Sequence, residues 1–412
     1  MTSYSPSVLT LILAPLVLAL ALAIDVYVPA IPKLTELFAV SDNIMLLTLS
    51  LFMLTAGIMQ LVIGPLSDTY GRKPITYGAV FAFSIGCVMC AASNSPLELI
   101  IGRIIQSIGS CGMLVLGFAI VRDCFEGRKS AKVYSYLNGI ISFSPMFAPF
   151  IGSHLDVYFG WRMMFISLLT ISILAIISLR WFLVETLPPT KRTSTSLHDL
   201  YKQYKLIFFH PTFAIYNVVT CFGLSYLYLF CALSPYLIIR NLEIPETQYG
   251  FYFFYMGVSF FVGSVICSQI VERIGIYFTC LIGLVISLVG GLWMAYWYLT
   301  SGLTLHGFIF PMLLIGIGGT FCMGAGQGGS MWPFGENIGA ASALGGALRF
   351  LFASLIGMLV ISDDVASTLP IGVPAILFSL IGLVLFVEFK SKLKGYGSEA
   401  SELNPTMINP AD

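Results

Sequence analysis

The sequence is poor in charge. Only 10% of its 412 residues are Asp, Glu, Lys or Arg, whereas soluble domains carry about 25%. A chain with so few charges cannot cover itself with a polar surface, which excludes an ordinary soluble domain. The formal net charge is zero, so charge indicates no particular partner, and we expect none among nucleic acids.

The residues that usually carry out catalysis or bind metals are also scarce. The four histidines are scattered, at His154, His198, His210 and His306. None stands in a paired catalytic or metal-binding spacing. Cys87 and Cys90 have a CxxC spacing, but they lie in an apolar run without histidine or acidic neighbours, so we expect them to be packing residues. The sequence therefore predicts no enzyme, no catalytic residues, no metal and no cofactor.

What the chain has in abundance is long apolar runs. Hydrophobic residues make up 58% and the mean hydropathy is +0.92. The runs are continuous rather than alternating, which favours helices over a barrel, and about 20 residues suffice to cross a bilayer. We predict an all-α membrane protein with twelve transmembrane helices, at 8–31, 43–64, 74–93, 97–121, 133–154, 162–183, 211–237, 249–270, 274–298, 304–326, 339–361 and 368–388. The first run has neither a basic start nor a cleavage site, so we expect it to remain as the first helix.

The basic residues predict the orientation. With the N-terminus in the cytoplasm, fifteen of the 20 Lys and Arg residues fall on the cytoplasmic side. Lys33, Arg162 and Arg240 fall outside, and Arg103 and Arg349 lie in or near spans. Positive residues collect on the cytoplasmic side of membrane proteins, so we expect both termini there.

The longest internal polar segment divides the chain into two halves. It follows the sixth span and contains Pro188-Pro189 and Lys191-Arg192. We predict two pseudo-symmetric six-helix bundles, as in transporters built from repeats. The expected domains are an N-terminal bundle (1–183), a cytoplasmic linker (184–208), a C-terminal bundle (209–389) and a cytoplasmic tail (390–412).

A charged, glycine-bounded turn between the second and third spans carries a recognisable motif. Its residues are Gly64, Leu66, Asp68, Gly71, Arg72 and Lys73. They match the G-x-L-x-D-x-x-G-R-[KR] pattern, so the chain resembles the major facilitator superfamily over nearly its whole length. The resemblance implies the major facilitator fold.

Further motifs resemble those of the Bcr/CflA-type twelve-span drug:proton antiporters. They are Asp25–Pro32, the fourth-span set Arg103, Gln106 and Gly109 with Ser107 in place of a glycine, Ala148-Pro149 with Gly152, and Ala340–Ala343. The resemblance implies a proton-coupled antiporter for drugs. In that family the arginine that matches Arg103 faces the central cavity and is tied to proton coupling.

Asp25 and Arg103 are the expected proton-coupling residues, and both are candidates for substrate binding. A carboxylate in hydrocarbon costs about 2.5–3.5 kcal/mol, and a low dielectric favours its protonated form. Asp25 could therefore carry a proton or exchange it for a cationic substrate; the alternative is a hydrated residue near the outer mouth. Arginine does not lose its proton, so Arg103 would tune a carboxyl group or hold a substrate acid, or else lie at the interface.

Arg349, in the middle of the eleventh span, departs from the resemblance, which implies a neutral residue there. A mid-membrane arginine should face protein, water or an opposite charge. It could pair with Asp25 or bind an anionic substrate. Tyr226 and Tyr252 are the expected aromatic substrate contacts, although more of the neighbouring aromatics are expected in the core or facing lipid.

The turn at 64–74 is also the expected cytoplasmic gate. It would comprise Gly64, Asp68, Gly71, Arg72 and Arg122. The Asp68 carboxylate would face the start of the eleventh span, since a negative charge is favoured at a helix N-terminus, and Arg122 would be its ion-pair partner. The alternative is a loop that only obeys the positive-inside rule.

The fifth span is expected to bend and seal the interface between the halves. Pro145 and Pro149 each remove a backbone donor, and Gly152 follows them.

The sequence thus predicts a monomeric secondary transporter of the bacterial inner membrane. It would export small molecules, drug-like compounds or metabolites, by alternating access coupled to protons, a function typical of multidrug efflux and antibiotic resistance. The alternative is a transporter of an anionic metabolite such as a polycarboxylate siderophore, bound by Arg349 and Arg103. The residues leave export and uptake both open.

Overall fold

The protein is helical throughout the part that the structure describes. The computed structural model describes residues 5–125, 127–181, 184–192, 197–335, 338–360, 365–391 and 393. The first half contains α1 (Pro6–Asp25), η1 (Val28–Ala30), α2 (Ile31–Leu37), α3 (Asp42–Tyr70), α4 (Arg72–Ala92), α5 (Pro96–Cys124), α6 (Gly127–Phe159) and α7 (Arg162–Trp181). The linker contains η2 (Pro189–Lys191) and α8 (Leu197–Phe208). The second half contains α9 (Pro211–Pro235), η3 (Tyr236–Asn241), α10 (Glu246–Ser301), α11 (Leu305–Met331), η4 (Trp332–Phe334), α12 (Ile338–Val360) and α13 (Leu369–Glu388).

The predicted set of spanning helices is confirmed. Among the described residues, 10 helical segments are long and apolar enough to cross a membrane. One of them, α10, joins two helices at Gly275, where φ is 79°. With α10 counted as two and the 33-residue α6 added, twelve segments cross, as the sequence predicts.

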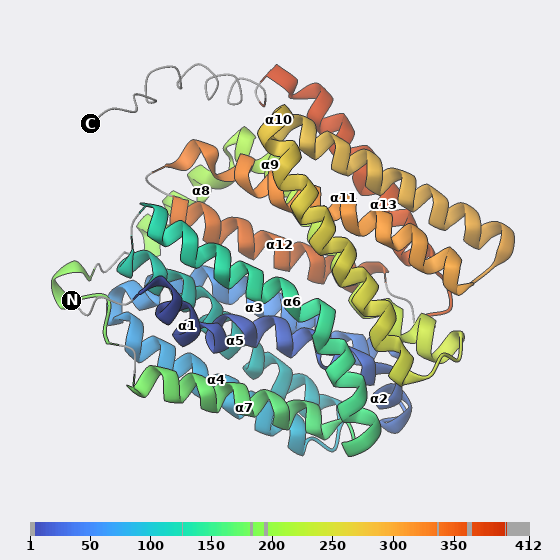
Figure 1. Ribbon diagram of the computed structural model, residues 1–412, viewed down its shortest axis with the longest axis horizontal. Helices are drawn as coiled ribbons and strands as arrows, with labels where there is room; N and C mark the ends of the chain where they lie inside the picture. Colours follow the sequence, from blue (N-terminus) through green and yellow to red (C-terminus); the bar gives the residue numbers. More distant parts are fainter. Residues whose placement is uncertain are drawn as a thin grey trace.

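The structure corrects two boundaries. The first spanning helix, expected to run to residue 31, ends at Asp25, and the chain then forms η1 and α2. The α-helix is interrupted because Pro29 and Pro32 lack the N–H groups that would continue its hydrogen bonds. The eighth and ninth spans meet in a turn at Gly275 (Figure 1) rather than in a loop at 271–273, because glycine adopts the positive φ of this turn without steric cost.

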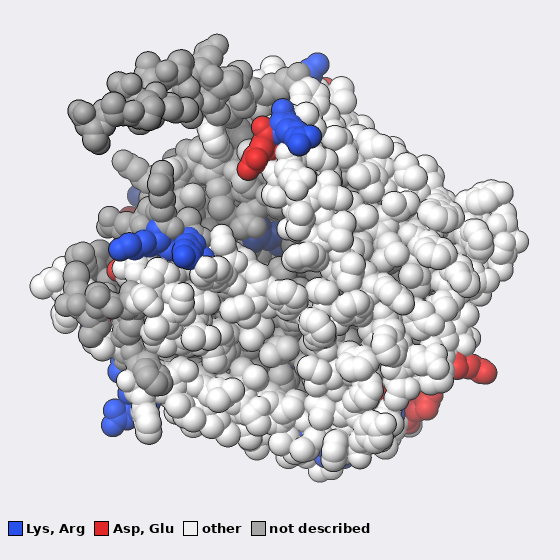
Figure 2. Space-filling model, in the orientation of Figure 1, with Lys and Arg blue, Asp and Glu red and all other residues white. Residues whose placement is uncertain are grey.

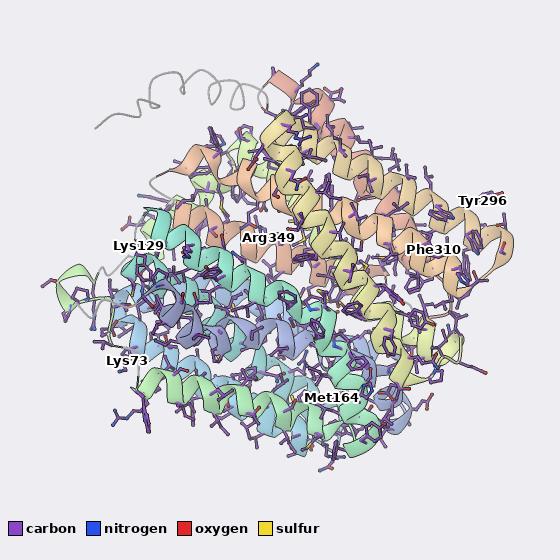
Figure 3. All side chains as sticks on the ribbon, in the orientation of Figure 1. Lys73, Lys129, Met164, Tyr296, Phe310 and Arg349 are labelled. Atoms are coloured by element: carbon purple, nitrogen blue, oxygen red, sulfur yellow. The ribbon has the colours of Figure 1, made fainter. Side chains whose placement is uncertain are left out.

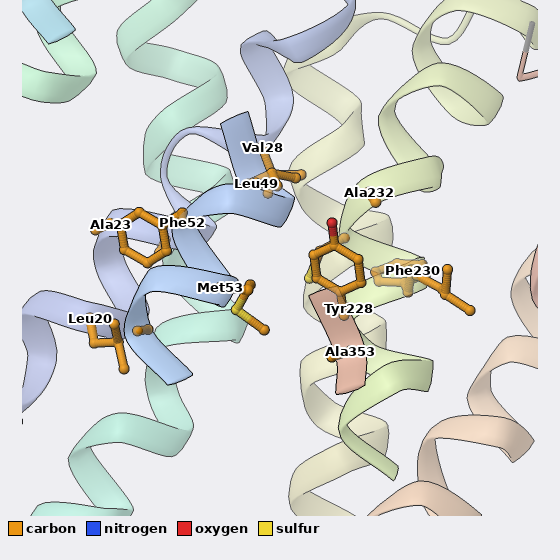
Figure 4. Close-up of a cluster of buried hydrophobic side chains, with 14 of the residues drawn as sticks. Leu20, Ala23, Val28, Leu49, Phe52, Met53, Tyr228, Phe230, Ala232 and Ala353 are labelled. Carbon is orange, nitrogen blue, oxygen red and sulfur yellow. The ribbon is translucent and has the colours of Figure 1, made fainter. Parts of the chain in front are cut away.

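The helices form two groups that face each other. Figure 1 shows the blue-to-green helices α1–α7 in one group and the yellow-to-red helices α9–α13 in the other. They meet mainly where α3 packs on α12 and α6 packs on α10. Figure 4 shows part of the buried core, with Leu20 and Phe52 on one side and Tyr228 and Phe230 on the other. This is the two-bundle arrangement expected from the sequence.

The linker helix α8 marks one end of the molecule. Tyr204 donates from its hydroxyl to the backbone O of Leu61 on α3 at 3.4 Å, and Ile207 packs with Ala341 and Leu344 of α12. We call this the α8 end. Figure 3 places Lys73 and Lys129 towards it, and Tyr296 and Phe310 towards the opposite end.

The domain boundaries at residues 183, 208 and 389 stay a prediction. Residues 193–196 of the predicted linker lie outside the described residues, as does the predicted tail apart from residues 390, 391 and 393.

Candidate functional site

A cavity of about 1020 Å³ lies between the two groups of helices. Its wall is made by α1, α3, α5 and α6 of the first half, by α9, α11 and α12 of the second, and by α8. Leu200, Gln203 and Tyr204 of α8 line it together with Ile338 at the start of α12, so the cavity reaches the α8 end. Figure 2 shows a hollow between the halves with a positively charged surface inside it.

The opposite end is closed by bonds between the halves. Arg240 at the end of α9 and η3 donates two hydrogen bonds, both 2.7 Å, to the Asp42 carboxylate at the start of α3. The hydroxyls of Thr35 and Tyr236 lie 2.7 Å apart. Deeper in, the Ser50 and Tyr228 hydroxyls are 2.5 Å apart. These four hydrogen bonds separate the cavity from the opposite end.

Asp25 lies in the cavity wall, as a site residue should. It ends α1, where the chain turns into η1, and only 6% of its surface is exposed. Ser144 of α6 donates from its hydroxyl to Oδ2 at 2.8 Å. The ion pairs recorded between described residues do not include Asp25. A buried carboxyl group with one neutral donor, facing a cavity, has the chemistry needed to take up and release a proton.

Arg349 of α12 lines the same cavity, and Figure 3 shows it near the middle of the molecule, between the halves. The ion pair with Asp25 that the sequence left open is not formed. The Arg349 guanidinium has no hydrogen-bond or ion-pair partner within the described part of the chain. It therefore presents an uncompensated positive charge to the cavity.

Arg103 is not part of the cavity wall. It is fully buried and donates from Nη1 to the Ala23 backbone O at 2.7 Å and to Gln106 Oε1 at 2.6 Å. The guanidinium carbon lies 4.7 Å from the ring centre of Tyr27 and 4.2 Å from that of Phe52, in the range of cation–π contacts. Arg103 thus holds the backbone of α1 two residues before Asp25, and any effect on substrate would pass through α1.

The two predicted aromatic contacts also lie outside the cavity wall. Tyr226 is fully buried in the second half, with its hydroxyl 3.4 Å from Ser379 Oγ, and Tyr252 makes an edge contact with Tyr255. The tyrosine of α9 in the wall is Tyr228. Two residues along a helix turn by about 200°, so Tyr226 and Tyr228 face opposite sides. Sequence reasoning missed Tyr228 because the aromatic stretch does not reveal which face of α9 meets the other half.

The turn between α3 and α4 carries a network of charges with the end of α5 and with Glu185 of the linker. Gly71 has a φ of 101°, which favours glycine. Arg72 forms ion pairs with Asp68 at 2.6 Å and with Asp123 at 2.7 Å. The Glu185 carboxylate accepts from the backbone N–H of Arg72 at 2.9 Å, at the N-terminus of α4 where a negative charge is favoured.

The predicted ion pair between Asp68 and Arg122 is therefore not formed, because Arg72 occupies the Asp68 carboxylate. Arg122 is exposed and lines the cavity with Gly64 and Asp68. It lies beside α12, since a Cβ on Gly339 would be 2.6 Å from its Nη1. Asp123 and Glu185 were missed, because neither belongs to the motif that singled out the turn.

The fifth spanning helix, α6, contacts both halves. It runs through Pro145 and Pro149 without a break, and Pro145 lines the cavity. A Cβ on Gly152 would collide with the backbone O of Val26, so glycine is needed where α6 passes the end of α1. On the other side, α6 packs against Gly250 and other small residues of α10.

Two helical bundles around a central cavity closed at one end define a polytopic membrane transporter. The chain belongs to the Major Facilitator Superfamily, whose profile matches residues 13–358. The family and the relatives below are transporters rather than enzymes, as expected.

Similar curated proteins include bacterial resistance proteins. A "Chloramphenicol resistance protein" of Pseudomonas aeruginosa is 26% identical over 397 residues, covering 95% of this chain and 92% of its own. A "Bicyclomycin resistance protein homolog" of Haemophilus influenzae is 25% identical over 354 residues, covering 84% and 87%. These names agree with the resemblance to the Bcr/CflA type.

Solved structures share the fold. A D-xylose–proton symporter has a TM-score of 0.73 at 16% identity, covering 92% of this chain and 97% of its own. A bacterial homolog of the human lysosomal transporter Spinster, in an inward-facing and unoccupied conformation, has a TM-score of 0.72 at 15% identity, covering 96% and 99%. At these identities the likeness concerns the fold alone.

Proposed function

We propose that this protein is a proton-coupled exporter of small, drug-like molecules that works by alternating access. The observation that carries the proposal is the cavity between the halves, which reaches Asp25, extends to the α8 end and is closed at the opposite end. A site exposed to one side at a time is what a secondary transporter needs. The drug-resistance names of the relatives support drug-like substrates.

In this proposal Asp25 carries the proton, and Arg103 holds Asp25 in position through the backbone of α1. Asp25 faces the cavity, while Arg103 binds the α1 backbone at Ala23. A proton moving inward gains about 2.3 kcal/mol per 100 mV of membrane potential and about 1.4 kcal/mol per pH unit. Either term is large enough to drive a substrate outward against a roughly tenfold gradient.

We further propose that the protein is a monomer in the inner membrane of a bacterium, with the α8 end in the cytoplasm. The excess of Lys and Arg in the loops at that end supports this orientation. The cavity would then be open to the cytoplasm, ready to load a substrate for export.

The turn between α3 and α4, at 64–74, would act as the cytoplasmic gate. Asp68 and Arg72 line the cavity near Arg122, and all three lie in the first half opposite the start of α12. When the mouth closes, α12 would approach this network, and the partners of Asp68 and Arg122 would change. Gly71, with its φ of 101°, would shape the turn, and Gly64 would line the mouth from α3.

Reconstitution in proteoliposomes tests the proposal. We expect chloramphenicol to be moved when a pH gradient is imposed, and Asp25→Asn to abolish the pH dependence because the amide cannot take up a proton. Asp25→Glu, which keeps the carboxyl group, is the matched control. Absence of any solute flux, with or without the gradient, would contradict the transport mechanism, and retained coupling in Asp25→Asn would move the proton site elsewhere.

The alternative, a carrier of an anionic metabolite, keeps the same cavity and mechanism. It is favoured by one observation, the unpaired Arg349 guanidinium in the wall. Arg103, its expected partner in binding an acid, is buried away from the cavity.

A further inference from the structure

The charged groups in the cavity wall are not balanced. Among its described lining residues are the acids Asp25 and Asp68 and the bases Arg72, Arg122 and Arg349. Asp68 and Arg72 form an ion pair at 2.6 Å, and Arg72 is shared with a second carboxylate outside the wall. As far as the described residues go, the groups in the wall left without an ion-pair partner are therefore one buried carboxyl and two guanidinium groups.

Of the two arginines without an ion-pair partner in the described part of the wall, Arg349 is the less exposed, and apolar side chains share its part of the cavity. The wall that Arg349 lines also contains the apolar side chains of Phe350 on α12 and of Leu224 and Leu227 on α9. An arginine keeps its charge in such surroundings, and a charge without a counter-charge is costly in a low dielectric. Water in the open cavity can hydrate it in the present state, but a cavity closing around a substrate removes that water.

Asp25 does not compensate the charge of Arg349. Its carboxylate is engaged by the Ser144 hydroxyl of α6 at 2.8 Å, within its own half. No ion pair joins the two residues in the described structure. A lipophilic cation placed between them would approach Asp25 but would also be repelled by Arg349.

We infer that the cavity binds an organic anion, with a carboxylate group of the substrate paired to Arg349 and its apolar body against Phe350, Leu224, Leu227 and the Tyr228 ring. The planar guanidinium matches a carboxylate with two parallel hydrogen bonds. Arg122, exposed at the α8 end of the same wall, raises the concentration of anions at the mouth. This inference rests on the proposed transport mechanism and develops the anionic alternative given above, for which it names the charge of the substrate and the residues that bind it.

Equilibrium binding to the purified full-length protein tests the inference without requiring transport. The probes are 2-naphthoate, its neutral methyl ester and the cation 2-naphthylmethylammonium, which share an aromatic body and differ in charge, and citrate as a polycarboxylate. We expect calorimetry to give the tightest binding for the naphthoate. Arg349→Gln should weaken that binding by about tenfold or more, since a charge-assisted bond contributes about 1.5–3 kcal/mol, and should leave the ester unchanged.

Two further variants serve as controls. Arg349→Lys keeps the charge but not the planar fork, so naphthoate affinity should fall between those of the wild type and Arg349→Gln. Arg180→Gln removes an exposed arginine at the end of α7 that does not line the cavity, and should bind as the wild type does.

The possible outcomes separate the two proposals. Equal or tighter binding of the cation or the ester, or unchanged naphthoate affinity in Arg349→Gln, would overturn the anion inference while leaving proton-coupled export intact. Retained binding of the ester by Arg349→Gln establishes that the variant is folded. Charge-selective binding without any flux in proteoliposomes would instead contradict the proposed function.

Discussion

At the scale of the residue, position 152 requires glycine because two helices approach each other closely there. It lies on α6 where the end of α1 passes, and a Cβ there would collide with the backbone O of Val26. A backbone atom cannot rotate away as a side chain can, so the helices would have to separate. Because Val26 follows Asp25 directly, such a shift would also displace the proposed proton site.

Gly152→Ala should therefore destabilise the protein by about 1–3 kcal/mol, as overpacking does. Gly139→Ala on the same helix is the matched control, because nothing lies within 4 Å of its Cβ position. That control should be neutral, or more stable by up to about 1 kcal/mol from helix propensity. Thermal unfolding of the purified proteins in detergent measures both, and equal effects would contradict this account of the α1–α6 contact.

At the scale of the element, the contact between the start of α3 and the end of α9 and η3 holds the opposite end shut. Asp42 accepts both hydrogen bonds from Arg240 and a third from the backbone N–H of Val365 at 3.2 Å. Asp42 is almost fully buried, so it is paired out of water, where ion pairs are stronger than at the surface. All of these bonds join the two halves and would break when that end opens.

Removing this pair should shift the protein towards a state open at the opposite end. In Asp42→Asn we expect Cys231, which lines the cavity, to be labelled several-fold faster by an impermeant maleimide added outside, in a background where the other cysteines are serine. The substitution removes the charge-assisted contact with Arg240, which exists only in the state closed at the opposite end, so it destabilises that state alone. A loss of about 1.4 kcal/mol in its stability would change the ratio of closed to open protein tenfold.

Arg162→Gln is the control for that experiment. The Arg162 guanidinium donates to the backbone O of Ser93 at 3.0 Å and to Asn94 Oδ1 at 3.2 Å, and all three residues belong to the first half, so breaking these bonds should leave Cys231 labelling unchanged. The charge swap of Asp42→Arg with Arg240→Asp should partly restore protection. Equal labelling of wild type and Asp42→Asn would show that the pair does not hold the halves together.

At the scale of the whole molecule, the proposed orientation follows from where the basic residues gather. Lys73 and Lys129 lie towards the α8 end, whereas Tyr296 and Phe310 lie towards the other (Figure 3). Anionic lipid headgroups on the cytoplasmic side attract Lys and Arg, and basic loops are retained there.

Reporter fusions test this orientation. Green fluorescent protein fused after the C-terminus should fluoresce, and alkaline phosphatase at the same position should be inactive, because that position is expected in the cytoplasm. Phosphatase inserted at Gly302, in the turn between α10 and α11, should be active. The reverse pattern would invert the orientation and turn the proposed exporter into one loaded from outside.

The sequence by itself determined the fold class, the number of spans and the family. A chain with little charge and continuous apolar runs is stable only as membrane-spanning helices, which determines the fold class. The turn at Gly71 carries a specific motif, which identifies the family. These signals are local, so they can be read without knowing which helices touch. The sequence also placed Asp25 and Arg349 at membrane depth, because a charge within an apolar run stands out.

Only the tertiary structure decided which side chains face the cavity. It put Tyr228 rather than Tyr226 in the wall, buried Arg103 against Tyr27 and Phe52, and paired Asp68 with Arg72 rather than with Arg122. In an apolar span nearly every face is hydrophobic, so periodicity does not tell which face meets lipid, protein or water. That choice depends on contacts between helices far apart in the chain, and the packing of the two halves settles it.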